Sequence, residues 1–300
     1  MKEKKIFEGV GTAIITPMKE DGSINEAVFK DLIEWQVNEG ADAVVVAGTT
    51  GEASTLSDEE HLRLVECAVG AVQGRIPVIA GAGSNDTAHA IFMEKECEKL
   101  KADAILSVTP YYNKTSQEGI YQHYKACANQ TTLPILVYNV PSRTGVTMIP
   151  QTYQRLAEID NIVGCKEAGT DMAQLAETAA LCGKGFAIYS GNDDLIVPTM
   201  ALGASGVISV LSNLVPRQVH DLVMECLHED WEQARKIQFY YMELNKALFS
   251  DVSPMPVKYA MKQIGFDVGV CRLPLCEMSN EKKRKMQDIL EKYCIKKMKI

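Results

Sequence analysis

The chain has 300 residues, of which 46% are hydrophobic and 23% charged, and its formal net charge at pH 7 is -8. This length allows one large core, and the negative charge disfavours nucleic acid and anionic membranes as partners. No apolar run approaches the ~20 residues that span a bilayer. Met1–Lys5 carries charge without an apolar segment behind it, so we expect no signal peptide and a cytoplasmic location.

Cysteine and histidine spacing disfavours metal and disulfide scaffolds. The nine cysteines are scattered, with no Cys-x-x-Cys pair, and the five histidines show no zinc-ligand spacing. We therefore expect no metal site, and we expect most cysteines to be buried free thiols.

Hydrophobic segments alternate with helix-like stretches from residue 10 to about residue 210. Most are continuous apolar runs, which is typical of parallel strands that are buried on both faces. Ser57 followed by Glu60 predicts a capping box at the start of one helix. The predicted strands are 12–16, 43–47, 77–81, 104–108, 135–139, 162–166, 186–190 and 206–210.

Eight strand–helix units over some two hundred residues predict a (β/α)8 barrel of the α/β class. A doubly wound open sheet is the main alternative, although it usually has fewer strands. After about residue 212 only helical patterns continue, with a loop at 253–256 and helices at 257–264 and 279–297. We predict a TIM barrel over residues 1–228 and a C-terminal helical region, 229–300, packed on it.

A lysine ends the predicted strand 162–166. Side chains alternate along a strand, so Gly164 and Lys166 share one face and Glu167 lies on the other. A buried ammonium is costly without water, a counter-charge or a chemical task, and a desolvated lysine amine can act as a nucleophile. On this stretch alone, a nucleophile and a lysine that snorkels to solvent are equally open.

The other predicted strand ends carry residues suited to a site, and barrel active sites lie at the C-terminal ends of strands. Gly48–Glu52 is a turn that can aim backbone N–H groups at a carboxylate, with two threonine hydroxyls beside them. It is not a phosphate-binding loop, because no Gly-Lys-Ser/Thr follows. The remaining rim residues are Tyr111, Tyr112, Tyr138, Arg143 and Ser190–Asp193.

A lysine, tyrosines and threonines at one rim suit Schiff-base chemistry. The lysine amine attacks a ketone, and loss of water gives an iminium that acts as an electron sink. A proton then leaves the adjacent carbon to give an enamine. A tyrosine hydroxyl that is hydrogen-bonded to a threonine could relay these protons. The chemistry needs no metal and no organic cofactor.

Three motifs together resemble the dihydrodipicolinate synthase family: Gly48–Glu52, Tyr138–Gly145 and Gly164–Ala168. This is the synthase branch of the pyruvate-dependent class I aldolases, which include N-acetylneuraminate lyase. The resemblance extends to Pro254–Lys258 and covers nearly the whole chain. It implies a barrel with a C-terminal helical region. It also implies condensation of pyruvate with L-aspartate 4-semialdehyde in lysine biosynthesis.

The resemblance also implies roles for residues. Lys166 corresponds to the Schiff-base lysine and Tyr138 to the general acid and base. Thr50 corresponds to the relay hydroxyl, and Thr49 with Thr50 would hold the pyruvate carboxylate. Tyr112 would complete the relay of a neighbouring subunit, so the family implies a tight dimer at minimum and a tetramer as the expected assembly.

Arg143 is the discriminating residue. The resemblance implies that it receives the carboxylate of the semialdehyde, while Gly191 and Ile208 contribute backbone carbonyls. A related sugar-acid aldolase would share Lys166 and Tyr138 but usually lacks this arginine. A barrel without catalytic activity, kept for binding, is the other alternative.

Lysine-sensitive members of the family bind lysine at the dimer interface, and this chain keeps only part of that pattern. Asp58 stands where sensitive members commonly carry a histidine, and His89 where they carry a glutamate. A histidine cannot replace the carboxylate that binds the ligand's ammonium, and we expect Asp58 to lie on the opposite side of the motif. We therefore predict weak or absent inhibition by lysine. The positions that match are Ser54, His61, Asn85 and Tyr111.

Overall fold

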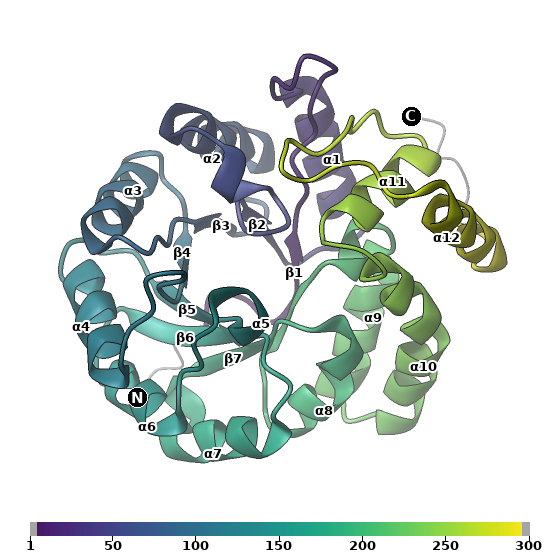
Figure 1. The fold of residues 1–300 in the computed structure, drawn as a ribbon. Coiled ribbons are helices and arrows are strands. Elements are labelled where there is room, and N and C mark those ends of the chain that lie inside the picture. The colour runs from purple at the N-terminus through teal and green to yellow at the C-terminus, as the bar shows by residue number, and fades with distance from the viewer. Residues whose placement is uncertain (1–4, 296–300) are drawn as a thin grey trace.

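Eight parallel strands form a closed barrel at the centre of the molecule (Figure 1). This computed structural model describes residues 5–295, and each strand lies beside the next in the chain until β8 closes onto β1. The predicted barrel is confirmed, and the open sheet is excluded. The strands are β1 (Gly9–Ala13), β2 (Ala43–Val46), β3 (Val78–Gly81), β4 (Ala104–Val108), β5 (Ile135–Asn139), β6 (Ile162–Glu167), β7 (Ala187–Ser190) and β8 (Gly206–Ser209).

The first strand begins three residues before its predicted start, at Gly9 instead of residue 12. Gly9 and Val10 belong to the strand because they pair with Gly206 and Val207 of β8, and the Asp42 carboxylate accepts a hydrogen bond from the Val10 N–H at 2.8 Å. A Cβ on Gly9 would lie only 2.0 Å from Asp42 Oδ2, so glycine is required where the carboxylate crosses the strand. The other seven strands lie within one residue of their predicted limits at each end.

Helices cover the outside of the barrel (Figure 1). The predicted capping box at Ser57 and Glu60 is confirmed, because each side chain accepts a hydrogen bond from the other's backbone N–H. The helices are α1 (Glu26–Asn38), α2 (Asp58–Val72), α3 (Thr87–Lys99), α4 (Gln117–Ala128), α5 (Pro141–Thr144), α6 (Pro150–Ala157), α7 (Met172–Cys182), α8 (Ile196–Ala201), α9 (Pro216–Leu227), α10 (Trp231–Leu248), α11 (Met255–Gln263) and α12 (Asn280–Lys292).

A register shift between β5 and β6 changes the direction of the side chains at the end of β6. Ile135 of β5 pairs with Ile162, but the next residue, Leu136, pairs with Gly164, so Val163 is an extra residue in β6. Such bulges re-aim the side chains that follow them. Beyond the bulge, the Cys165 side chain packs in the outer core between sheet and helices.

The last three helices pack together beside α9 (Figure 1). Apolar residues of α10, α11 and α12, among them Leu244, Met261 and Leu290, belong to the same hydrophobic core as the barrel's outer face. The predicted helices 257–264 and 279–297 correspond to α11 and α12, although residues 296 and 297 lie outside the described residues, as do residues 1–4. The boundary between residues 228 and 229 stays a prediction.

No helix within residues 5–295 is long and apolar enough to cross a membrane. The same residues contain no group of three or more His, Cys, Asp and Glu side chains placed to hold a metal ion. All nine cysteines are free thiols. Five are buried: Cys67, Cys97, Cys127, Cys165 and Cys226.

Candidate active site

Lys166 and Tyr138 meet inside the mouth of the barrel. They are direct register partners at the C-terminal ends of β6 and β5, and both are almost fully buried. The Lys166 Nζ lies 4.5 Å from the centroid of the Tyr138 ring, which is a favourable cation–π distance. The Lys166 side chain forms no hydrogen bond or ion pair within residues 5–295, although it interacts electrostatically with the buried Asp193 carboxylate. The amine of this buried side chain therefore remains available for chemistry.

A hydrogen-bond network fixes this pair from behind the barrel wall. Glu167 and Asn139 are the next register partners, and the Asn139 Nδ2 donates to both Glu167 carboxylate oxygens, at 2.9 and 3.1 Å. The Tyr153 hydroxyl and the Gly169 N–H each donate to the same carboxylate at 2.6 Å. Burial raises the pKa of Glu167, and these donors oppose that shift. We name Asn139, Tyr153, Glu167 and Gly169 the β5–β6 clamp.

The turn Gly48–Glu52 follows β2 at the same mouth. The Thr16 hydroxyl donates to the Gly51 carbonyl at 2.7 Å, and the Glu52 N–H donates to the Thr49 carbonyl at 3.1 Å. Thr50 is buried. Neither its hydroxyl nor that of Tyr138 forms a hydrogen bond within residues 5–295. The relay between these two groups therefore stays a prediction.

A cavity of about 510 Å³ opens beside this turn. Its lining includes three predicted substrate or catalytic residues, Thr49, Tyr138 and Arg143. Lys166, Thr50, Gly191 and Ile208 are not part of that lining. Residues of the C-terminal region, which the sequence did not connect with the site, also line the cavity: Ser253, Pro254, Pro274 and Leu275.

Arg143 projects from α5, the short helix after β5. Its Nη2 donates to the Ser253 carbonyl at 3.1 Å, which draws the guanidinium towards the C-terminal region. It forms no ion pair with a carboxylate in the described part of the chain. A cationic fork at the edge of a cavity, without an acidic partner, is suited to a ligand carboxylate.

The ends of β7 and β8 are held together by a buried carboxylate. Asp193 Oδ2 accepts hydrogen bonds from the Val210 and Leu211 N–H groups, each at 3.0 Å, just beyond Ile208. A Cβ on Gly191 would lie 2.6 Å from the Ala168 Cβ, so only glycine fits this approach of β7 to β6. The sequence places Asp193 at the rim, but only the fold shows that its carboxylate reaches the end of the next strand.

The chain matches the model of the dihydrodipicolinate synthetase family over residues 6–293. It belongs to this family. A 4-hydroxy-tetrahydrodipicolinate synthase from Thermoanaerobacter sp. (strain X514) is 49% identical over 289 residues, which are 96% of this chain and 97% of the relative.

Two solved structures of the family are similar over nearly the whole fold. The chloride-inhibited dihydrodipicolinate synthase from Acinetobacter baumannii, complexed with pyruvate, has a TM-score of 0.95 at 40% identity. The enzyme from Cyanidioschyzon merolae with lysine bound has a TM-score of 0.95 at 38% identity. Each alignment covers 97% of this chain and 100% of the other chain.

Tyr112, which the family resemblance assigns to a neighbouring subunit's relay, is not part of the cavity of its own chain. Its side chain is 91% exposed, and its backbone has a φ of 66°, a left-handed conformation that is strained for a tyrosine. The adjacent Tyr111 does line the cavity. Tyr112 therefore points away from the site that its own chain builds.

The residues of the predicted lysine site line the same cavity, apart from Asn85, which does not. His61 is buried, its Nε2 lies 2.7 Å from the Gly81 carbonyl, and burial lowers its pKa. The expectation that Asp58 lies on the opposite side of the motif from His89 is wrong. The Asp58 Oδ1 is 3.0 Å from the His89 Nε2, because α2 and α3 are adjacent in the ring. The remaining lining residues of this group are Ser54 and Tyr111.

Proposed function

We propose that this chain condenses pyruvate with L-aspartate 4-semialdehyde to give 4-hydroxy-tetrahydrodipicolinate, the first committed step of lysine and diaminopimelate biosynthesis. The observation that carries the proposal is the buried Lys166 amine, which faces Tyr138 and has no hydrogen-bond or ion-pair partner in the described chain. The synthase from Thermoanaerobacter and the pyruvate complex of the Acinetobacter enzyme support it.

The mechanism begins on Lys166. Its amine attacks the C2 carbonyl of pyruvate, and loss of water gives the iminium. A proton leaves C3, and the resulting enamine attacks the aldehyde carbon of the semialdehyde. The amino group of the second substrate then attacks C2, which closes the ring and releases the lysine amine. Tyr138 moves the protons, with Thr50 and a neighbouring subunit's Tyr112 as its relay.

Binding requires two anion sites in the same mouth. The turn that carries Thr49 and Thr50 receives the pyruvate carboxylate, and the carbonyls of Gly191 and Ile208 face the bound pyruvate. Arg143 receives the carboxylate of the semialdehyde. A sugar-acid lyase would need hydroxyl-binding groups there, and the unpaired guanidinium at the cavity edge favours the synthase.

The active assembly that we propose is a homo-oligomer built on a tight dimer, and a tetramer is the expected form. The exposed and strained Tyr112 is the feature that supports it. The enzyme uses the covalent Lys166 adduct in place of a metal or an organic cofactor, and it acts in the cytoplasm.

The test is reductive trapping followed by turnover. Pyruvate with borohydride should add one reduced pyruvate per chain, found by mass spectrometry on the peptide that contains Lys166. Adding pyruvate together with the semialdehyde to unreduced enzyme should then give a product that a dihydrodipicolinate reductase consumes. The absence of any adduct would indicate a barrel that only binds. An adduct without turnover of the semialdehyde would indicate another aldolase of the family.

A further inference from the structure

The turn that carries Thr49 and Thr50 ends on a buried ion pair with the C-terminal region. The Lys258 Nζ, from α11, donates to Glu52 Oε1 at 2.7 Å and to the Val270 carbonyl at 2.7 Å. Both charged side chains are at most 2% exposed. Glu52 itself has a φ of 59°, so a strained backbone is held where the turn ends.

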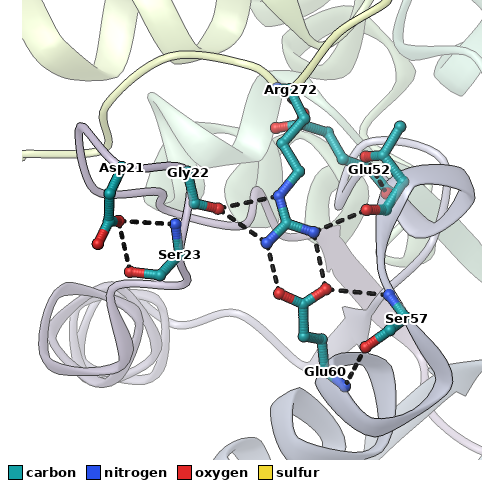
Figure 2. A network of polar contacts seen from close by, with 8 residues as sticks. Asp21, Gly22, Ser23, Glu52, Ser57, Glu60 and Arg272 are labelled. Carbon is teal, nitrogen blue, oxygen red and sulfur yellow. Dashed lines mark hydrogen bonds and ion pairs between the residues drawn. The ribbon is translucent and has the colours of Figure 1, made fainter.

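A second cation from the same region holds the rest of this loop (Figure 2). The backbone N–H of Arg272 donates to Glu52 Oε2 at 2.9 Å. Its guanidinium grips both oxygens of Glu60, at 2.7 and 2.5 Å, and also donates to the Thr55 carbonyl at 2.7 Å. It reaches the Gly22 carbonyl, in the loop after β1, at 2.9 and 2.8 Å. One arginine therefore joins the loops that follow two strands.

The hydrogen bond from Arg272 is the largest of the effects that lower the pKa of Glu60, to about 2. Glu60 is also the capping-box residue at the start of α2, so Arg272 fixes the beginning of that helix as well. The segment that carries Arg272 continues into Pro274 and Leu275, which line the cavity. The contacts that hold the turn and one wall of the cavity thus come from a single stretch of chain.

We propose that Lys258 and Arg272 are positioning residues for the pyruvate-binding turn, acting through Glu52 and Glu60. A buried ion pair is weak evidence for stability alone, since apolar side chains of similar volume often do as well. Here the pair holds a left-handed residue, Glu52, two positions after Thr50, which fits a role in fixing conformation. The inference rests on the proposed function, because the turn is assigned to the pyruvate carboxylate.

The first test compares two arginines. Like Arg272, Arg75 donates two hydrogen bonds to one glutamate, Glu34, at 2.9 and 2.5 Å, and it also donates to backbone carbonyls. Unlike Arg272, it follows the C-terminal end of α2, at the end of the barrel opposite the mouth. The variants are Arg272→Ala, Arg272→Lys and the matched control Arg75→Ala. For each, the pyruvate concentration that gives half-maximal borohydride trapping is measured together with Tm.

We expect Arg272→Ala to raise that pyruvate concentration at least ~10-fold, in line with the loss of several charge-assisted hydrogen bonds. Arg272→Lys should lie between wild type and Arg272→Ala, and Arg75→Ala should stay within about twofold of wild type. The KM for the semialdehyde should move much less than that for pyruvate. Equal changes for both substrates, or an unchanged trapping curve for Arg272→Ala, would overturn the inference. Failure of the wild-type protein to form any adduct would instead remove the proposed function.

The second test separates positioning from folding. Lys258→Met leaves the Glu52 carboxylate buried without its partner, so this variant is expected to lose much of its folded population. The double variant Glu52→Gln, Lys258→Met removes both charges and should recover folded protein and Tm. Its pyruvate half-saturation should nevertheless remain raised, because the turn is no longer tied to α11. Recovery of wild-type pyruvate affinity in the double variant would contradict the role of the pair.

Discussion

The two sides of the barrel mouth are built in different ways. On one side, Lys166 and Tyr138 are neighbours in the sheet, and the β5–β6 clamp that backs them comes from residues within thirty positions of one another. On the other side, Thr49 and Thr50 sit on a turn whose polar anchors, Lys258 and Arg272, lie more than two hundred positions further along the chain.

We call the part of the mouth with Lys166 and Tyr138 the sheet side, and the part with Thr49 and Thr50 the turn side. We expect the sheet side to determine the rate of the chemical steps and the turn side to determine pyruvate binding. The positions of the amine and the tyrosine are set by sheet hydrogen bonds, which every strand of the barrel supports. The turn is held by Thr16 and, in addition, by side chains of the C-terminal region. We therefore expect substitutions behind the sheet to affect kcat, and substitutions in the C-terminal region to affect the KM for pyruvate.

The largest effect should come from Lys166→Ala, which removes the proposed nucleophile from the sheet side. We expect no reduced pyruvate adduct and the loss of nearly all turnover, with pyruvate still able to bind non-covalently at the turn. Lys184→Ala, an exposed lysine, is the control and should form the adduct normally. If borohydride still fixed pyruvate to the Lys166→Ala chain, the nucleophile would have to be another residue.

Tyr112 of a neighbouring subunit should complete the proton relay on the sheet side. Tyr112→Phe and Tyr138→Phe subunits should each be strongly impaired, at the level of ~10²-fold or more for lost proton transfer. In a mixed dimer, one site would carry both lesions and the other would be intact. Activity should therefore return on mixing, as measured by initial rates after subunit exchange. Proven exchange without recovery would show that Tyr112 does not act across the interface.

Glu167→Gln should weaken the β5–β6 clamp without touching substrate. A neutral amide offers one acceptor oxygen in place of two, so the four donated hydrogen bonds cannot all be kept. We expect kcat to fall ~10-fold and the pyruvate half-saturation to change little, the reverse of the result for Arg272→Ala.

The matched control is Glu94→Gln, which also alters a buried glutamate outside the barrel wall. Glu94 accepts a hydrogen bond from the Ser107 hydroxyl at 3.0 Å, and burial raises its pKa to about 7, but its partner lies in β4, away from Lys166. This variant should leave kcat within about twofold of wild type. An equal loss of kcat in both variants would mean that the β5–β6 clamp has no special link to the catalytic pair.

Arg143→Ala should affect the second substrate more than the first. The loss of a directional arginine–carboxylate pair should lower kcat/KM for the semialdehyde ~10–100-fold. The half-saturation for trapping of pyruvate should change by less than about threefold, since the pyruvate turn is held by other groups. Parallel losses for both substrates would remove the reason to call Arg143 the specificity residue.

The sheet side of the mouth could be predicted from sequence, because its signals are local. Continuous apolar runs located the strands, and a lysine at a strand end located the nucleophile candidate. The predicted start of β1 was too late, because the pairing of Gly9 and Val10 with β8 is a tertiary feature. The alternation of side chains separated Lys166 from Glu167 but could not show that Asn139 and Tyr153 meet the carboxylate.

The turn side could be predicted only in part. The threonines stand in a glycine-flanked motif, but in the sequence Lys258 is only one member of a longer motif and nothing distinguishes Arg272. Charged residues in a helical region are usually solvated, and nothing local indicates which of them fold back over two hundred residues. The same limit explains Asp58 and His89, whose contact depends on how two helices pack in the ring.

The smallest effect that we predict is that of added lysine, which bears on the turn side alone. The enzyme from Cyanidioschyzon merolae has been solved with lysine bound. In this chain, three of the four positions that match the predicted lysine site, Ser54, His61 and Tyr111, line the cavity beside the turn. A carboxylate is present in this region, but Asp58 already contacts His89 at 3.0 Å, so the ammonium of a ligand would have to displace that contact. Because Asp58 is engaged with His89, we predict weak or absent inhibition by lysine.

The measurement is the initial rate at saturating pyruvate while L-lysine is titrated well above cellular levels, with wild type beside the double variant Asp58→His, His89→Glu. That variant places the acid where the sensitive members have it, and it should become the more sensitive of the two. The lysine site adjoins the turn. Bound lysine should therefore raise the pyruvate concentration needed for half-maximal trapping, and it should have a smaller effect on the amount of adduct at saturating pyruvate. Strong cooperative inhibition of the wild-type enzyme by submillimolar lysine would contradict the prediction, because it would mean that lysine readily displaces the contact between Asp58 and His89.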